Sequence, residues 1–226
     1  MIVMRLSGML RQTWAAVKIL VVLTIVCGVV YPLAVWAVSS VPGLGNKAEG
    51  SIVSYNGQAV GSSLIGTNPI DPNATQDITN DRYFHTRPSA QASDFSASDK
   101  TKLGLGDIDP SSSSASNLAS SSDVLLAQVA ARKELIGKRE GVSPGQVPVD
   151  AVTASASGLD PAISPDYAYL QAARVARVTG LTDQQVRQIV ADNIEGRSLS
   201  VLGEPKATVL ALNLAVTRAV RATHGG

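Results

Sequence analysis

The side chains that could most readily take part in a reaction lie in one segment, residues 147–165, where hydroxyl and carboxylate groups are closely spaced. Ser155 and Ser157 with Asp160 have the residue types of a nucleophile and an acidic partner. The same segment is rich in small residues, and Leu159-Asp160-Pro161 is typical of a turn. Small residues permit close backbone approach, so we favour a structural scaffold here over a catalytic serine.

A second segment, Tyr83-Phe84-His85-Thr86-Arg87-Pro88-Ser89-Ala90, combines aromatic residues with a histidine and an arginine. Such a segment can bind an ion, but it is more often an aromatic anchor in a core with a satisfied arginine beside it. His85 has no His or Cys at metal-ligand spacing, and His224 lies near the C-terminus, so we do not expect zinc. Asp107 and Asp109 could suggest calcium, but their loop lacks the other acidic residues of an EF-hand calcium loop.

Familiar catalytic motifs are missing from the sequence. There is no G-x-x-x-x-G-K-[ST] phosphate loop, no G-x-G-x-x-G after a strand, and no S-x-x-K or G-x-S-x-G nucleophile motif. The 19 basic and 18 acidic residues nearly balance, which argues against a nucleic-acid partner. A single cysteine excludes an intrachain disulfide.

The compartment of all these residues depends on an apolar run, Ile19 to Val38, which contains no charged residue. Roughly 20 helical residues cross a hydrocarbon core, and backbone groups in lipid must pair within the segment. Trp14 and Trp36 stand where an aromatic belt would place them. We therefore predict a transmembrane helix, in which Pro32 kinks the helix or loosens its last turn.

Charged residues around the run predict its orientation. Arg5, Arg11 and Lys18 precede it, whereas Lys47 and Glu49 follow it and cancel. The positive-inside rule puts the N-terminus in the cytoplasm and the main domain outside, in the cell (inner or plasma) membrane.

Two alternatives compete with this anchor. Ala37-Val38-Ser39 could serve as a signal-peptide cleavage site, but the run is longer than the usual apolar region of such peptides. Cys27 could be acylated as in a lipoprotein, but it lies in the middle of the run without a small residue before it. We therefore favour a retained span over both alternatives.

The expected architecture is a membrane-anchored α+β protein with one extracytoplasmic domain. Its parts are a cytoplasmic tail (1–18), a transmembrane helix (19–38), a linker (39–50), and a domain (51–226) with a serine-rich loop near 89–122, which we expect to be loop or locally disordered. Asn56-Gly57 between apolar runs predicts a β-hairpin over 51–60. With only two Phe, the core must be built from Val, Leu, Ile and Ala.

Capping signals predict several C-terminal helices. One is expected from Asp123 to near Gly141, and a second from Ser164-Pro165 to Gly180. Thr182 with Gln185 forms a capping box that opens a third helix, which we expect to end at Gly196. Pro205 is expected to open the last helix.

At these residues the chain resembles the KdpC family, the C subunit of the bacterial Kdp potassium-transporting P-type ATPase. The resemblance spans essentially the whole chain, because its pieces occur in order with the right spacing around a single N-terminal span. The matching residues that become candidates for the domain scaffold or a partner interface are Tyr83, Phe84, His85, Arg87, Pro88, Thr153, Ser155, Ser157, Gly158, Leu159, Asp160, Pro161, Ser164, Pro165, Glu204, Pro205 and Asn213. Departures from the family pattern are Thr67, Ala162 and the serine run at 111–114.

The resemblance implies a role in a complex. In this family a channel-like A subunit and a P-type ATPase B subunit carry transport and hydrolysis, and a small F subunit is a further partner. The C subunit is needed for assembly and acts as a catalytic chaperone that raises the ATP affinity of the B subunit. ATP would then be bound by the partner, and this chain would carry no cofactor, metal or catalytic residue of its own.

Three hypotheses follow. The leading one is a non-catalytic accessory subunit whose span packs against partner helices through Gly28, Pro32 and Ala34, with lipid around it. The second is a membrane-anchored extracytoplasmic serine hydrolase that uses Ser155 or Ser157. The third is an ion filter or ion-binding module formed by the outer domain.

Overall fold

The computed structural model describes residues 2–74 and 76–224, and side chains from Gly8 to Ala74 and from residue 76 to Thr223. The side chains of Arg5 and His224 therefore lie outside the described ones. The chain forms two compact units that meet between Ser51 and Ile52. The division of the first unit into tail, span and linker stays a prediction.

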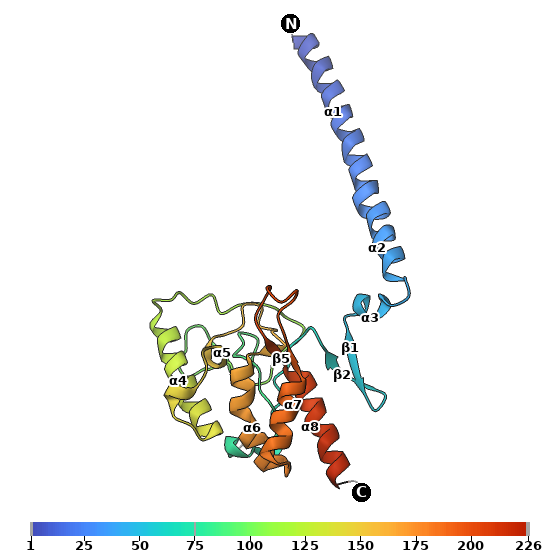
Figure 1. Cartoon of the computed structure of the whole chain (residues 1–226). Helices are drawn as coiled ribbons and strands as arrows, with labels where there is room; N and C mark the ends of the chain where they lie inside the picture. Colours follow the sequence, from blue (N-terminus) through green and yellow to red (C-terminus); the bar gives the residue numbers. More distant parts are fainter. Residues whose placement is uncertain (1, 75, 225–226) are drawn as a thin grey trace. The chain divides into compact units, whose positions relative to one another are not determined.

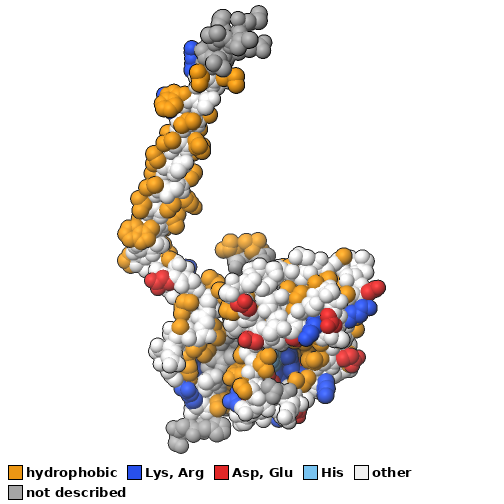
Figure 2. Space-filling model, turned by 180° about the vertical axis from the view of Figure 1, so that it is seen from behind, with side chains coloured by type: hydrophobic (Ala, Val, Ile, Leu, Met, Phe, Trp, Pro, Cys, Tyr) orange, Lys and Arg blue, Asp and Glu red, His pale blue; other side chains and the backbone are white. Residues whose placement is uncertain are grey.

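The first unit is mainly helical. Helix α1 (Ile2–Ile25) continues through a π-helical segment (Val26–Val30) into α2 (Tyr31–Ser39), and a short α3 (Gly45–Ala48) follows. The π-helical segment ends two residues before Pro32, which cannot donate the backbone hydrogen bond that an α-helix needs at this place. Among the described helices, one stretch, Gly8–Ser39, is long and apolar enough to cross a membrane. Hydrophobic side chains cover it in Figure 2.

The second unit begins with the predicted hairpin. Strand β1 (Ile52–Tyr55) pairs antiparallel with β2 (Gln58–Ser62). Asn56 and Gly57 have φ values of 51° and 77°, as a type I′ turn requires. The prediction from Asn-Gly is confirmed.

The following segment, residues 63–122, has little regular structure in its described part. It contains two 3₁₀ turns, Pro72–Ala74 and Ile78–Asn80, and the isolated bridges Ala92–Ile108 and Phe95–Leu103. Four aliphatic side chains from its described part are buried, namely Ala74, Ala92, Leu103 and Ile108. The serine-rich stretch is thus a loop that is tied to the domain at several points.

Helices then follow in the predicted order, although their ends differ in places. Helix α4 (Asp123–Glu140) ends at Gly141, but its cap is Ser122 rather than Asp123, since the Ser122 hydroxyl accepts from the amide of Leu125. The short α5 (Val149–Val152) precedes α6 (Pro165–Thr179), whose cap Ser164 and stop Gly180 are as predicted.

Two predicted boundaries near the C-terminus are wrong. Helix α7 (Asp183–Asp192) has the Thr182–Gln185 capping box but ends at Asn193, before Gly196. Pro205 precedes a strand instead of opening a helix, and α8 spans Val209–His224. The reason is a small antiparallel sheet in which β5 (Lys206–Thr208) lies between β3 (Ala162–Ile163) and β4 (Ile194–Glu195). Pairing on both sides makes the extended backbone more favourable than helix here.

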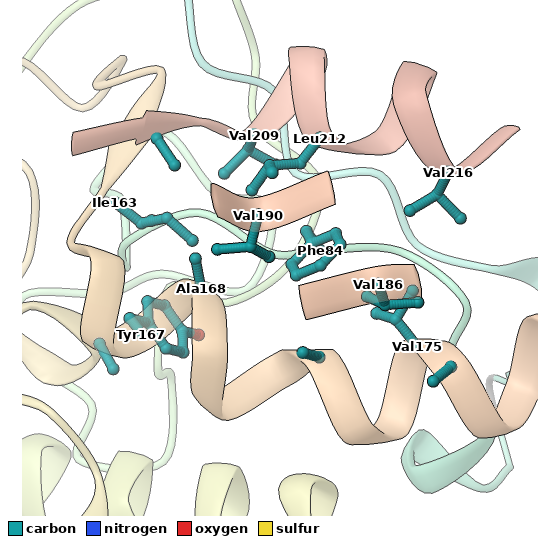
Figure 3. Packing of buried hydrophobic residues seen from close by; sticks show 14 of the residues in the cluster. Phe84, Ile163, Tyr167, Ala168, Val175, Val186, Val190, Val209, Leu212 and Val216 are labelled. Carbon is teal, nitrogen blue, oxygen red and sulfur yellow. The ribbon is translucent and has the colours of Figure 1, made fainter. Parts of the chain in front are cut away.

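The core lies where α6, α7 and α8 pack together (Figure 1). As predicted, aliphatic side chains dominate it. Phe84 is fully buried and lies close to Val186 and Val190 of α7, while α8 contributes Leu212 and Val216 (Figure 3). Tyr167 of α6 is the other fully buried aromatic among the described residues. The segment around Phe84 thus runs through the centre of the helical layer.

Candidate functional site

The two serines of the 153–161 segment are used to close a turn. Ser155 is buried, its amide donates to the carbonyl of Pro88 (2.8 Å), and its hydroxyl accepts from the amide of Asp160 (3.3 Å). The Ser157 hydroxyl accepts from the amide of Leu159 (3.0 Å) and lies 3.3 Å from that of Ser155. Among the described contacts, neither hydroxyl touches an imidazole, so a serine–histidine pair is not assembled.

Arg87 joins the two motif segments that sequence reasoning picked out separately. Its Nη1 lies 3.1 Å from Oδ2 of Asp160, and its Nε donates to the carbonyl of Thr153 (3.3 Å). The side chain is 27% exposed and that of Asp160 is 38% exposed, so the pair sits at the domain surface. An ion pair this exposed contributes little stability by itself, so its main effect is to fix the geometry of the turn.

Two glycines allow the neighbouring loops to come close to this turn. Gly66 donates to the carbonyl of Leu159 (2.8 Å), and a Cβ at position 66 would overlap the carbonyl oxygen of Asp160. Gly158 has φ 74°, and a Cβ there would lie 2.7 Å from the carbonyl oxygen of Ser114. The predicted close backbone approach is therefore present, and we name these residues, Gly66, Arg87, Thr153 and 155–160, the motif turn.

A buried ionic network joins the end of α4 to α6. Glu140 at the end of α4 accepts from Arg139 (2.6 Å) and from Arg174 of α6 (3.0 Å). Arg139 also donates to the Tyr167 hydroxyl (2.9 Å), and Arg174 donates to the carbonyl of Asp81. Burial raises the pKa of Glu140, but the two guanidinium groups outweigh it and hold this pKa below its usual value. Glu140 therefore stays charged.

His85 is buried next to this network. Its Nδ1 lies 3.0 Å from Oδ1 of Asn68, while its Nε2 lies 3.4 Å from Oδ2 of Asp81 and makes no hydrogen bond. Burial, together with the charges of Arg139 and Arg174, lowers the pKa of His85 to about 4. The ring is neutral at neutral pH, which makes it a packing residue.

Amide side chains hold the backbone around Phe84 in place. Asn213 of α8 accepts from the amide of Phe84 (2.7 Å) and donates to its carbonyl (3.1 Å). Gln171 of α6 bonds His85 in the same two-way manner, at 2.8 and 3.1 Å. This extended segment thus obtains from two helices the hydrogen bonds that a sheet would otherwise supply.

Sequence reasoning missed a second anchor, on α4. Arg132 is 1% exposed and donates to the carbonyls of Leu103 (2.7 Å) and Val152 (2.9 Å). Gln128, one turn earlier, donates to the carbonyls of Ser96, Asp99 and Lys102. Burial lowers the pKa of Arg132 to about 10. The only signal in the sequence is the four-residue spacing of two long polar side chains.

Residues 13–218 match the family model KdpC, described as K+-transporting ATPase, c chain. The chain belongs to the KdpC family. Relatives named potassium-transporting ATPase KdpC subunit include one from Bradyrhizobium diazoefficiens, 41% identical over 93% of this chain and 98% of that protein. One from Rhodopseudomonas palustris is 42% identical over 94% of this chain and 100% of that protein. One from Kineococcus radiotolerans is 41% identical over 95% of this chain and 97% of that protein.

The structure places the remaining KdpC motif residues at separate positions of the domain. Ser164 opens α6 and bonds both carboxylate oxygens of Asp150 (2.8 Å each). Glu204 is exposed and pairs with Arg197 (3.0 Å), just before Pro205. Gly28, Pro32 and Ala34 belong to the other unit. No group of three His, Cys, Asp or Glu side chains suited to a metal ion occurs among the described residues.

Proposed function

We propose that this KdpC family member is a non-catalytic accessory subunit of a potassium-transporting P-type ATPase complex, held in the membrane by the helix Gly8–Ser39. The observation that carries the proposal is the internal use of the motif side chains. The hydroxyls of Ser155 and Ser157 close a turn, and Arg87 binds Asp160. Side chains that are held by internal hydrogen bonds and an ion pair build a rigid surface. Such a surface suits a partner interface better than a catalytic site.

The proposed partners are the A and B subunits, with the small F subunit as a further one. Gly28 and Ala34 are exposed within their own chain, since no described residue of α2 or of the π-helical segment is buried. Small residues let membrane helices approach closely, so these two positions are the proposed contacts with partner helices.

The chain is also proposed to raise the ATP affinity of the B subunit without binding ATP. If the domain lies outside, as the charges before the span favour, ATP is on the other side of the membrane. The effect on ATP then has to be a coupling free energy carried through the membrane subunits, of about 1–3 kcal/mol in typical allosteric proteins.

Co-purification tests the accessory role. A complex isolated through its other subunits should contain this chain, and a complex without any copy of it would contradict the proposal. The Ser155→Ala, Ser157→Ala double variant should assemble and support transport. A folded double variant that had lost a hydrolytic activity of the wild type would instead support the serine hydrolase.

Protease accessibility tests the placement of the domain. When protease is given access to the outer side of an intact plasma (inner) membrane, it should digest residues 52–226 while the N-terminus stays protected. If the domain is digested only after this membrane is broken, the orientation is the opposite of the proposed one. A direct contact between the domain and the nucleotide-binding parts of the B subunit would then be feasible.

A further inference from the structure

The connection between β4 and β5, residues 196–205, carries aliphatic side chains in water. Leu199, Val201 and Leu202 are 84%, 71% and 58% exposed. Every residue from Glu195 to Glu204 is exposed, and Figure 1 shows the connection as a red-brown projection beside the label of β5. We call residues 196–205 the apolar finger. Exposed aliphatic residues that are adjacent in this way indicate an interaction site more strongly than isolated ones.

The finger has a defined shape. The amide of Ser198 donates to the carbonyl of Leu202 (2.8 Å), and the amide of Leu202 donates to the carbonyl of Ser198 (2.9 Å). Leu199 and Ser200 at the tip have φ values of 52° and 65°, which side-chain-bearing residues rarely adopt. A strained tip that displays aliphatic side chains is expected at a binding site, because folding alone gains nothing from it.

Two ion pairs neutralise the neck of the finger. Arg197 lies 3.0 Å from Glu204, and Lys206 lies 3.6 Å from Glu195. No charged residue occurs between Ser198 and Gly203. The tip therefore offers hydrocarbon without charge, and it rises from β5, the central strand of the small sheet.

We propose that the apolar finger inserts into the lipid surface of the membrane in which the chain is anchored. The backbone of the tip suits this solvent, since the amides of Ser198, Ser200, Val201 and Leu202 are all paired within the finger. Unpaired amides are costly in hydrocarbon. Lipid rather than protein is favoured because the tip has no charged side chain with which to select a partner surface.

The tether permits this contact. Residues 40–51 follow the span and contain the one-turn helix α3. With α3 kept and the other eight residues extended, this tether reaches about 30 Å. A domain the length of residues 52–226 has a radius of gyration of about 16 Å, which is about half the reach of the tether. The domain can therefore turn a large part of its surface toward the bilayer. The inference rests on the proposed membrane anchor but not on the side of the membrane.

Spin labels at single cysteines test the insertion in the full-length chain. Cys27→Ala removes the single native cysteine, and Leu199→Cys then places a label at the tip. Val149→Cys is the matched control, since Val149 is 78% exposed on α5, outside the finger. In phosphatidylcholine nanodiscs, the label at position 199 should collide with dissolved oxygen several-fold more than with a water-soluble nickel chelate, and the label at 149 should show the reverse.

Two further results would decide against lipid. Equal preference for the nickel chelate at positions 199 and 149 would show that the tip stays in water, although incorporation into nanodiscs would still support the anchor. Protection of position 199 from both reagents, seen only when the other subunits are present, would assign the finger to a protein partner. As a check within the finger, Val201→Asp with Leu202→Asp should return the label at 199 to water.

Discussion

Acidification from pH 7 to pH 5 should destabilise the domain that follows the anchor, which begins at Ile52, through His85. The pKa of this side chain falls from its ordinary 6.5 to about 4 in the folded domain, because the ring is buried and near Arg139 and Arg174. The unfolded chain therefore takes up a proton between these values while the folded domain does not. Stability is fully present above pH 6.5 and is lost as the pH falls toward 4.

The size of this effect follows from the two pKa values. Over the whole interval the loss is about 3 kcal/mol, of which about 2 kcal/mol falls between pH 7 and pH 5. For a domain of this size, about 2 kcal/mol corresponds to a fall of about 4–8 °C in melting temperature. Asp81, whose pKa is lowered to about 2, adds its own loss only below about pH 4.

The assay is thermal unfolding of the full-length chain in detergent micelles, followed by circular dichroism at pH 7, 6 and 5. His85→Gln should flatten the pH dependence in this range, whereas His224→Gln, which removes the chain's other histidine, should leave it unchanged. If His85→Gln loses as much melting temperature between pH 7 and pH 5 as the wild type, the buried neutral histidine does not explain the effect.

Three further changes test the packing of the site. Gly158→Ala should cost about 1–3 kcal/mol more than Gly141→Ala in chemical unfolding, since both glycines have positive φ but only position 158 lacks room for a Cβ. Equal costs would contradict this. Glu140→Gln should destabilise the domain by about 3–5 kcal/mol, because two buried guanidinium groups lose their carboxylate; a shift in melting temperature below about 3 °C would count against it. Arg132→Lys should speed amide hydrogen exchange in residues 96–103 but not in the hairpin β1–β2, and uniform acceleration would point to a general loss of stability.

Local signals explain which parts of the fold were predictable. The turn at Asn56-Gly57, the cap at Ser164 and the capping box at Thr182 depend on a few adjacent residues, so they are readable from sequence. The end of α7 and the start of α8 were misplaced because short strands are decided by pairing. Strand β5 has three residues and is stable only between two partners that are distant in the sequence.

The candidate site shows the same division. Arg87, Ser155 and Asp160 come from the two segments that the sequence singles out, and the structure brings them together. Their hydrogen-bond partners were not predictable, because the ion pair of Arg87 spans two segments far apart in the chain. Arg132 and Glu140 were missed for a different reason. On a helix they look like solvent-facing residues. Arg132 is buried by the segments that carry Leu103 and Val152, and Glu140 is buried by its contact with Arg174 of α6.

We propose that this chain assists an ATPase without performing catalysis itself, and the ATP affinity of the complex is the most direct test. The ATPase complex should be purified with and without this chain, and the ATP concentration for half-maximal hydrolysis compared. Adding the chain should lower this concentration by about 5-fold or more, which corresponds to a coupling free energy of at least about 1 kcal/mol, while the chain alone should hydrolyse no ATP. An unchanged ATP affinity in a complex that contains the chain would contradict this proposal.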